Sequence, residues 1–405
     1  YNNFGTVDAQ LGGSLGSGNV FNNAGTLIRN GTSTSSTFTV NAVFNNTGAV
    51  HVQSGRLQFG GVGTSSGSFQ LDTGTVMRLQ SGTMALDAGS TWLPGDGTVE
   101  LFGGSLDVTA DIRLGGLSIL SGSSVLTGSG DITVAGPFTW NEGLLRGTGR
   151  LITEGNSVIG GFRTKYLDRT IDNKGTAEWT DGTIQSSTSV AIEYNNTGTF
   201  DMQSDDIFSG STATFNNAGT LLKSAGGGQS TIYPQFNNTG TVQVQSGTLS
   251  FGGGGNSSGS FEMDANTTLR VQSGTMVLDA SSTWTGDGSL SITGGTLDVA
   301  VDTEIKSNLS LGSSSSAILT GAGEITVGGE SGRFSSPAQA IAAGVSLVTE
   351  DRKNLSLVMT SSVAHNITLA ALDQYMKAGV IRRRPEREAV RESIEDLRIK
   401  TPGPE

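Results

Sequence analysis

The chain has 405 residues, of which 35% are apolar and 6% aromatic, and its formal charge is −12. It has no cysteine and only two histidines, His51 and His365, which excludes disulfides, thiolate zinc sites and cysteine nucleophiles and leaves little material for a catalytic triad. The negative charge disfavours nucleic acid and anionic membranes as partners, and no apolar run reaches the roughly 18 residues of a transmembrane helix. The 61 glycines favour a thin, repetitive core over a thick one.

The first residues, Tyr1-Asn2-Asn3, already belong to a repeat, because the same three residues return at Tyr194. The segment FNNTGAVHVQSGRLQFGG from Phe44 returns as FNNTGTVQVQSGTLSFGG from Phe236, a shift of 192 residues. The sequence therefore predicts nearly two copies of one long unit. Because Tyr1 is followed neither by a charged start nor by an apolar secretory signal, we expect it to lie inside a longer protein.

Short strands recur within each unit. Alternating runs such as Thr241–Val244 and Thr248–Phe251 indicate strands bounded by Gly, Asn and Ser turns. Phe215 and Phe236 open the same motif and are 21 residues apart. Coils of this length pair their backbone edges by stacking, and they align Val, Leu, Ile and Phe in one narrow core. The sequence therefore predicts an all-β fold, a parallel β-helix.

An Asn-Asn pair followed by Gly marks one position in the coils. Asn and Gly tolerate positive φ, so the motif predicts a tight corner between strands. Stacked Asn side chains also predict hydrogen-bonded ladders from coil to coil. The aromatic residues before the pair, Phe21, Phe44, Phe215 and Phe236, are expected to stack beneath these corners. The alternative, that Asn-Asn-Thr-Gly is a glycan acceptor, is disfavoured by the repetition.

Two Trp- and Gly-rich blocks, FTWNEGLLRGTG from Phe138 and TAEWTDGTIQ from Thr176, are typical of large repetitive bacterial surface proteins. Over residues 1–332 the coils resemble those of filamentous-haemagglutinin and autotransporter-passenger proteins. The resemblance implies a right-handed parallel β-helix and an extracellular or cell-surface, outer membrane-associated location. It also implies a non-enzymatic role as a stalk, adhesin or passenger, with surface glycans and host or cell-envelope components as partners.

Some parallel β-helices cleave polysaccharides, so a carbohydrate-active enzyme is an alternative function. Such a site needs clustered carboxylates beside a Lys or Arg. The acidic residues here are scattered, at Asp72, Asp87, Asp131, Asp264 and Asp279. Gln203-Ser204-Asp205-Asp206 could bind a cation but is better explained as a solvated turn. We predict no catalytic residue, no metal site and no cofactor.

Other candidate ligand-binding residues are also better explained by structure. Gly95-Asp96-Gly97 and Gly286-Asp287-Gly288 lack the tandem array of calcium-binding repeats. Trp92 and Trp284 occupy equivalent positions in the two copies, which favours packing over stacking on sugars. The remaining tryptophans are Trp140 and Trp179. His51 stands where the second copy has Gln243, so it is predicted to be an outward surface residue.

The pattern changes to α/β from Ser335. Only three glycines lie beyond Phe334, against 61 in the whole chain. Ser336 and Pro337 predict the start of a short helix that Gly344 ends, and Val345–Val348 follows as a strand.

A second helix is predicted from Pro385, with Val390, Ile394 and Leu397 on one face and charges on the other. The basic run Arg382-Arg383-Arg384 could attract nucleic acid. With Glu residues around it, a solvated helix start is the better interpretation.

The segment SPAQAIAAGVSLVTEDRKNLSLVMTSSVAHNITLAAL, from Ser336, resembles the second nucleotide-binding cassette of ribose, galactose and xylose ABC importers. The family pattern is a Ser-Pro-x-x-Ala-Ile-x-x-Gly helix, a strand, Glu-Asp-Arg-Lys, and a Ser-Val-x-x-Asn-Ile helix start. Glu350-Asp351-Arg352-Lys353 match its third part, and Ser362-Val363 with Asn366-Ile367 match its fourth. The resemblance implies a Q-loop position for Glu350, whereas Ser356 replaces a usual Gly.

The parts that would bind ATP are missing. No Walker A motif, Gly-x-x-x-x-Gly-Lys-Ser/Thr, occurs in the chain, and no signature motif or Walker B aspartate follows. The segment is therefore predicted to be an inactive ABC-ATPase fragment without a nucleotide cofactor. An importer component, as a fragment or gene fusion, is a further alternative function.

The repeat locates the boundary between the two parts. DITVAG at Asp131 continues into another coil, whereas EITVGG at Glu324 runs into Glu330-Ser331-Gly332-Arg333. We therefore predict a β-helix over residues 1–332 and a separate ABC-like fragment over 333–405.

Overall fold

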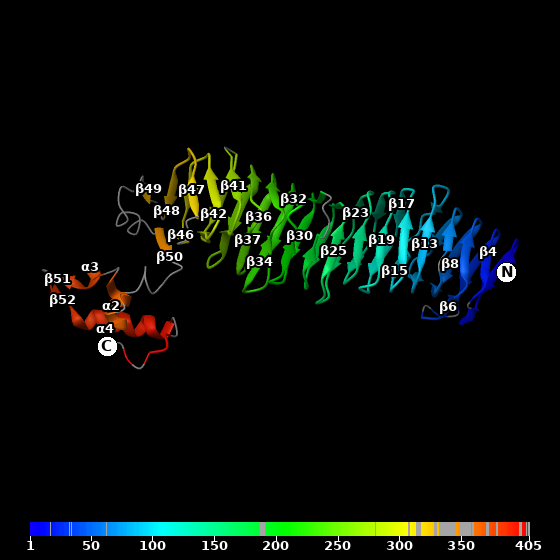
Figure 1. Cartoon of the computed structure of the whole chain (residues 1–405), viewed down its shortest axis with the longest axis horizontal. Helices are drawn as coiled ribbons and strands as arrows, with labels where there is room; N and C mark the ends of the chain where they lie inside the picture. Colours follow the sequence, from blue (N-terminus) through cyan, green and yellow to red (C-terminus); the bar gives the residue numbers. More distant parts are fainter. Residues whose placement is uncertain are drawn as a thin grey trace. The chain divides into compact units, whose positions relative to one another are not determined.

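The computed structural model confirms the all-β prediction, because most of the chain forms a parallel β-solenoid of about 15 turns (Figure 1). The chain divides into two compact units, the first containing Tyr1–Leu311 and the second Leu347–Glu405. The structure describes all residues except 17, 32, 34, 62, 187–190, 280, 307, 313–316, 328–329, 332–344, 349–357, 359, 370–371, 378–379, 397–398, 402 and 404–405. The predicted boundary at Arg333 lies outside the described residues and stays a prediction.

Each coil contributes three strands, one to each of three faces. Each strand pairs in parallel with the strand three positions further along the chain, with two breaks, between β14 and β17 and between β42 and β45. The first face consists of β1 (Asn2–Asn3), β4 (Val20–Asn23), β7 (Val43–Asn46), β10 (Gly63–Ser65), β13 (Thr83–Leu86), β16 (Ser105–Val108), β19 (Val125–Thr127), β22 (Leu144–Arg146), β25 (Lys165–Asp168), β28 (Ile184–Gln185), β31 (Ile207–Ser209), β34 (Gln229–Ile232), β37 (Thr248–Phe251), β40 (Thr268–Val271), β43 (Ser289–Ile292) and β46 (Leu309–Gly312).

The other two faces follow the same order along the chain. The second face consists of β2 (Thr6–Ala9), β5 (Thr26–Asn30), β8 (Ala49–Ser54), β11 (Ser68–Leu71), β14 (Thr91–Trp92), β17 (Ile112–Leu114), β20 (Ile132–Val134), β23 (Leu151–Thr153), β26 (Ile171–Asn173), β29 (Ile192–Asn196), β32 (Ala213–Asn217), β35 (Gln235–Asn238), β38 (Gly255–Ser257), β41 (Thr275–Leu278), β44 (Thr296–Val299) and β47 (Ile318–Thr320). The third face consists of β3 (Gly13–Leu15), β6 (Thr37–Val40), β9 (Arg56–Phe59), β12 (Val76–Leu79), β15 (Thr98–Leu101), β18 (Gly116–Ile119), β21 (Phe138–Trp140), β24 (Ser157–Ile159), β27 (Thr176–Trp179), β30 (Thr199–Met202), β33 (Thr220–Lys223), β36 (Thr241–Val244), β39 (Ser260–Met263), β42 (Thr283–Gly286), β45 (Thr303–Ile305) and β48 (Ile325–Val327), and β49 (Glu330–Ser331) pairs antiparallel with β48.

The alternation seen in the sequence sets which side chains face inward. In β8, Val50 and Val52 are buried while Ala49 and His51 are partly exposed, and most strands repeat this pattern. The inward side chains form one hydrophobic cluster that extends from Phe21 to Val327. A single inward row in each strand therefore builds the narrow core that the composition predicts.

The predicted asparagine ladder is confirmed. Asn196 Nδ2 donates to Asn217 Oδ1, and Asn217 Nδ2 donates to Asn238 Oδ1, each at 2.8 Å. All three side chains are buried. The predicted aromatic rows from coil to coil are present, with ring centroids of Phe215 and Phe236 5.8 Å apart, but these rings are tilted by 42° and not stacked, and they lie within the strands and not beneath corners.

The prediction of positive φ at this motif is wrong. The residues following the pair, such as Gly198, Gly219 and Gly240, are absent from the positive-φ glycines of the described chain. Glycine is needed here because the coils approach closely: a Cβ on Gly219 would lie 2.1 Å from the carbonyl oxygen of Gly198. Positive φ occurs at other corners, for example at Gly161 and Gly182.

The second copy of the long unit is rotated by one face relative to the first. The Asn-Asn strand β7 lies on the first face, but its counterpart β35 lies on the second face. Strands β8 and β36, and β9 and β37, are displaced in the same way. The counterparts are 28 strands apart, which is nine coils of three strands and one strand more. Equivalent outward side chains of the two copies therefore point in different directions.

The second unit contains three described helices, α2 (Val363–Thr368), α3 (Leu372–Tyr375) and α4 (Arg383–Asp396), and a short hairpin of β51 (Met376–Lys377) and β52 (Val380–Ile381). Ser362 caps α2 by accepting a hydrogen bond from His365 N, which confirms the predicted helix start. Strand β50 (Val345–Val348) is also confirmed.

Helix α4 begins two residues before the predicted Pro385. Val390 is buried in it, and Arg382, Arg383 and Arg384 are exposed, as a solvated helix start requires. The predicted helix from Ser336 to Gly344, and Leu397, lie outside the described residues. Across the part of the chain that the structure describes, no helix has the length and apolarity needed to cross a membrane.

Candidate functional site

Two of the buried charged side chains of the solenoid, Lys165 and Lys223, lie on one corner, where the chain passes from the third face to the first. We call Lys165, Asp181, Asp205, Asp206 and Lys223 the charged corner. These residues come from four successive coils, between β24 and β34. The corner brings several titratable side chains together around buried lysines, so it is the first candidate for chemistry.

Lys165 is fully buried and is held by backbone oxygens. Its Nζ donates to the carbonyl oxygens of Gly161 at 2.7 Å, Asp181 at 2.9 Å and Arg163 at 3.2 Å. These three acceptors use all the donors of an ammonium group. Burial lowers the pKa of Lys165 to about 8, and the charge of Asp181 opposes part of that shift. The amine therefore serves to hold the corner and is not open to a substrate.

The acidic pair at the same corner also has structural partners. Asp205 Oδ1 lies 3.0 Å from Nζ of the buried Lys223, and Asp205 Oδ2 accepts from Gly228 N at 2.9 Å. Asp206 Oδ2 accepts from Gly182 N at 2.8 Å. The segment is a turn and Asp205 is 41% exposed, as predicted for a solvated turn. The sequence did not indicate that the turn neutralises a buried lysine.

Two buried arginines repeat this arrangement elsewhere. Arg169 donates to the carbonyl oxygens of Gly130 and, at 3.2 Å, Arg146, and burial lowers its pKa to about 10. Arg29 donates to Ala9 O at 2.5 Å and to Arg56 O at 3.3 Å, and burial lowers its pKa. Buried polar groups need such partners, so each cation connects neighbouring coils.

The scattered carboxylates make local contacts. Asp87 Oδ1 accepts from Gly89 N at 2.9 Å, and Asp279 Oδ1 accepts from Ser281 N at 2.8 Å. Asp131 Oδ1 accepts from Arg150 N at 2.7 Å. Within the described ranges, no three His, Cys, Asp or Glu residues are close enough to hold a metal ion.

The structure places the tryptophans and His51 as predicted. Trp140 and Trp179 are fully buried, and Trp92 and Trp284 stack on Phe69 and Phe261, with ring centroids 5.0 and 5.6 Å apart. His51 is outward on β8, with Nε2 2.9 Å from Asp72 Oδ1.

Two exposed aromatic residues, which the sequence patterns did not indicate, lie on the corner between the third and first faces. Phe162 is 77% exposed and Phe102 is 47% exposed. Arg163 lies over the ring of Phe162 at 5.3 Å, and Arg78 lies over the ring of Phe102 at 4.7 Å. They are three coils apart, about 14 Å along the axis at the usual strand spacing. The adjacent Arg163 in a Gly-rich corner could have indicated Phe162, whereas Phe102 has no such signal because Arg78 comes from the preceding coil.

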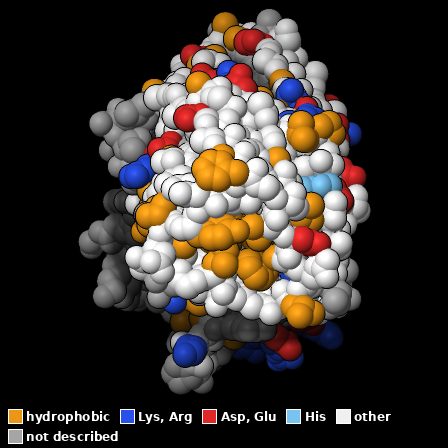
Figure 2. Space-filling model, turned by 90° about the vertical axis from the view of Figure 1, so that its right-hand side faces the viewer, with side chains coloured by type: hydrophobic (Ala, Val, Ile, Leu, Met, Phe, Trp, Pro, Cys, Tyr) orange, Lys and Arg blue, Asp and Glu red, His pale blue; other side chains and the backbone are white. Residues whose placement is uncertain are grey.

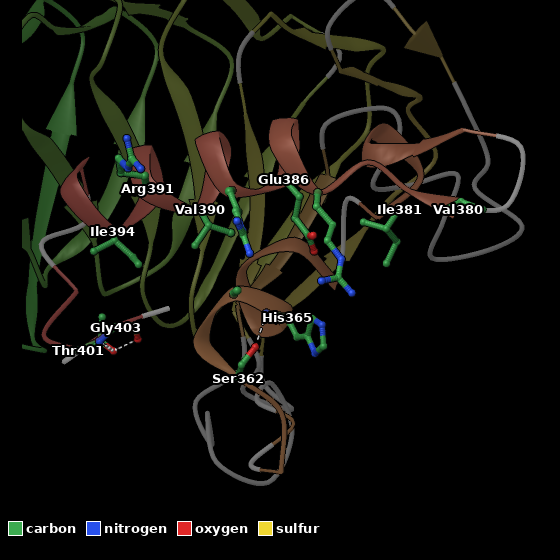
Figure 3. A pocket seen from close by; sticks show the side chains of 13 residues that line it. Ser362, His365, Val380, Ile381, Glu386, Val390, Arg391, Ile394, Thr401 and Gly403 are labelled. Atoms are coloured by element: carbon green, nitrogen blue, oxygen red, sulfur yellow. Dashed lines mark hydrogen bonds between the residues drawn. The ribbon is translucent and has the colours of Figure 1, made fainter. Parts of the chain in front are cut away.

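The second unit contains a cavity of about 870 Å³. Figure 3 shows Ser362 and His365 of α2 on one side and Glu386, Val390 and Ile394 of α4 on the other. The lining contains both polar and apolar side chains. Among the described residues, no Gly-rich phosphate-binding loop lines the cavity. The Q-loop-like residues Glu350, Asp351, Arg352 and Lys353 lie outside the described residues.

Comparison with known proteins confirms the resemblance to sugar importers over about 80 residues. The ribose import ATP-binding protein RbsA of Cereibacter sphaeroides is 44% identical over 81 residues, which are 20% of this chain and 16% of the relative. The xylose import ATP-binding protein XylG of Pectobacterium atrosepticum is 38% identical over 84 residues, 20% of this chain and 16% of the relative. The arabinose import ATP-binding protein AraG of Pseudomonas syringae pv. syringae is 40% identical over 85 residues, 21% of this chain and 17% of the relative.

The chain thus spans about a sixth of the length of the curated relatives it matches. No protein-family model and no solved structure matches the chain. The structure shows a parallel β-solenoid, and the comparisons show a partial match to importer ATP-binding proteins.

Proposed function

We propose that this chain is a non-enzymatic repeat protein of the cell surface or the extracellular space, in which the solenoid acts as a stalk, adhesin or passenger. The observation that carries the proposal is the use of the buried charges. Lys165, Lys223, Arg29 and Arg169 each bind backbone carbonyls or a neighbouring carboxylate. Groups held in this way stabilise the stacking of coils and offer no free acid, base or nucleophile.

The location is tested on cells that produce the protein. We expect protease added outside intact cells to digest the solenoid, while a cytosolic marker in the same cells stays intact. Recovery of the protein in the cytosolic fraction alone, protected from external protease, would refute the proposed location. Incubation with neutral and acidic polysaccharides tests the enzyme alternative, because a released product would contradict the non-enzymatic role.

Surface glycans are the proposed partners, and the exposed rings of Phe102 and Phe162 support this proposal. An exposed aromatic ring offers a flat apolar surface that can cover the apolar side of a sugar. The second copy offers a matched variant, because Thr293 stands at the position equivalent to Phe102. We expect Phe102→Thr with Phe162→Ala to lose binding on a glycan array without loss of the folded solenoid. Unchanged binding would remove these rings from the proposal.

A second candidate function, the nucleotide-binding component of an importer, is favoured by the match to RbsA, XylG and AraG alone. The missing Walker A motif argues against it, because that loop binds the phosphates in such proteins. Titration with Mg-ATP separates the two functions.

A further inference from the structure

The second copy of the repeat keeps an outward arginine but lacks the carboxylate that neutralises it in the first copy. GTVELFGGSLDV of the first copy returns as GSLSITGGTLDV, so Ser291 stands at the position of Glu100. Arg78 lies beside Glu100 in the register of the sheet. Its counterpart Arg270 lies beside Ser291. The two places therefore differ by one carboxylate next to the same cation.

In the first copy the carboxylate uses the donors of the arginine. Arg78 Nε and Nη2 lie 2.8 and 2.7 Å from Glu100 Oε2. Another outward arginine, Arg113, has such a partner in Glu154 at 2.8 Å. Over the described surface that Figure 2 shows, blue Lys and Arg side chains are interspersed with red Asp and Glu side chains. Ion pairing is thus one way in which this acidic chain accommodates outward arginines.

In the second copy, Arg270 forms no ion pair with any carboxylate among the described residues. Its Nη1 donates to the amide oxygen of Gln229, two coils away, and its Nε is buried without an acceptor. A buried donor without a partner costs free energy. A carboxylate beside Ser291, where Glu100 extends in the first copy, would accept from Nε once the guanidinium takes the orientation of Arg78. The place therefore favours an added carboxylate.

The side chains around Arg270 are polar, uncharged and joined to one another on the first face. Gln272 Nε2 donates to the hydroxyl of Tyr233 at 3.1 Å. Gln272 Oε1 accepts from Gln229 Nε2 at 3.1 Å and from Ser250 Oγ at 3.0 Å. Amides and hydroxyls donate and accept hydrogen bonds, so they can exchange their partners for the hydroxyls of a sugar.

Tyr233 adds a flat aromatic surface to the same place. Its ring packs on Gly252 of the next coil, where a Cβ would lie 2.5 Å from Cδ1 and 2.8 Å from Cε1 of the ring. The ring is partly exposed, and the first copy has Asn41 at this position. An aromatic ring that lies along the surface can cover the apolar side of a sugar.

We propose that these five residues, here called the Arg270 patch, bind a uronic acid unit of an acidic polysaccharide; they are Gln229, Tyr233, Ser250, Arg270 and Gln272. Arg270 binds the carboxylate through Nε and Nη2, Tyr233 covers the sugar ring, and the glutamines bind its hydroxyls. A carboxylate of a peptide would use the arginine alone, whereas a sugar also uses the ring and the amides. The inference rests on the proposed role in glycan binding and names the class of glycan.

The test measures binding of tetrasaccharides of glucuronate, galacturonate and mannuronate to the full chain by calorimetry. The salt concentration is 0.15 M, at which charges more than about 8 Å away are screened. We expect at least one uronate to bind saturably, and its methyl ester, which keeps the sugar but removes the charge, to bind about tenfold more weakly. Arg270→Gln should weaken binding of the acid about tenfold and that of the ester hardly at all, because both changes remove the same interaction. Tyr233→Ala should weaken binding of the acid and the ester alike.

Ser291→Glu is a matched variant, because it copies the pair of Arg78 and Glu100 that the chain already folds. We expect it to abolish binding of the acid by neutralising Arg270 from within. Ser291→Gln has the same size without the charge and should lose less affinity. Hydrogen exchange in β40 and β43 checks that each variant keeps its fold.

Three results would overturn the proposal: no binding of any uronate, equal binding of the acid and its ester, or unchanged affinity in Ser291→Glu. Tighter binding of a tetraglutamate peptide than of every uronate would overturn the assignment to a sugar. None of these results bears on the proposed cell-surface location, which external protease tests separately.

Discussion

The buried asparagine ladder gives the sharpest test of what holds the coils together. Asn217 is 1% exposed, accepts from Asn196, and donates to Asn238 Oδ1 at 2.8 Å and Thr241 O at 3.0 Å. Asn217→Ala removes these three bonds and leaves Asn238 Oδ1 buried without its donor. Asn196 still donates to Thr220 O at 2.9 Å. A buried group left without a partner costs about 1–3 kcal/mol, so we expect a loss of about 3 kcal/mol in the free energy of unfolding.

The neighbouring outer ladder supplies a matched control. Asn216 donates to Asn195 at 2.8 Å and accepts from Asn237 at 3.0 Å, but it is only partly buried, so water can replace its partners. We expect Asn216→Ala to cost about 0.5–1 kcal/mol. Urea unfolding with hydrogen exchange of β32 and β35 measures both variants, because a solenoid can open locally. Equal losses at the two positions would refute a special role for the buried ladder.

Three further outcomes follow from named contacts. Gly219→Ala should lower the free energy of unfolding by about 1–3 kcal/mol, because the new Cβ would clash with the carbonyl oxygen of Gly198. Gly227→Ala is the control and should leave stability nearly unchanged, because its Cβ would meet nothing within 4 Å. Equal unfolding midpoints for the two variants would contradict a close approach of the coils at Gly219. The pKa of Lys165 is about 8 when folded and 10.5 in its ordinary state, so the unfolded chain holds more protons above pH 8. Between pH 7 and 9.5 the free energy of unfolding of the unmodified protein should therefore rise by about 1–2 kcal/mol more than that of the Lys165→Met variant. A difference between the two proteins that does not change with pH would show that the pKa of Lys165 is not lowered by folding. Calorimetric titration with Mg-ATP should give no binding heat, and saturable binding would revive the importer function.

The fold could be predicted from the sequence because its determinants repeat. Every coil needs an inward apolar row and close backbone approach, so Phe215 and Phe236, or Asn217 and Asn238, recur at the spacing of one coil. Repetition thus allowed the solenoid and the ladder to be predicted without knowing which residues touch. Repetition could not show why glycine is required at Gly219. A close approach to the carbonyl oxygen of Gly198 and a positive φ would each require glycine, so the sequence does not distinguish between them.

The charged corner could not be predicted because its residues occur at single positions and act across coils. Lys165 and Asp181 are 16 residues apart in the chain, and Lys223 and Asp205 are 18 apart. No local sequence pattern distinguishes these buried lysines from the solvent-exposed lysines found in most proteins. The sequence therefore predicts a solvated turn at Asp205 and Asp206, but it does not predict the buried Lys223 that Asp205 contacts.

The rotation of the second copy by one face changes how the surface can be used. Stacking requires only that inward rows align, and counterparts such as Val50 and Val242 both satisfy it although they lie on different faces. Outward side chains are not constrained in this way. A ligand that extends along one face therefore does not contact the same outward residues in both copies, because the second copy presents them on a different face. Residues that the repeat does not copy add a further difference between the outward surfaces of the two copies. Phe102 fits this description, since its counterpart is Thr293, and its corner is where we expect recognition to be found.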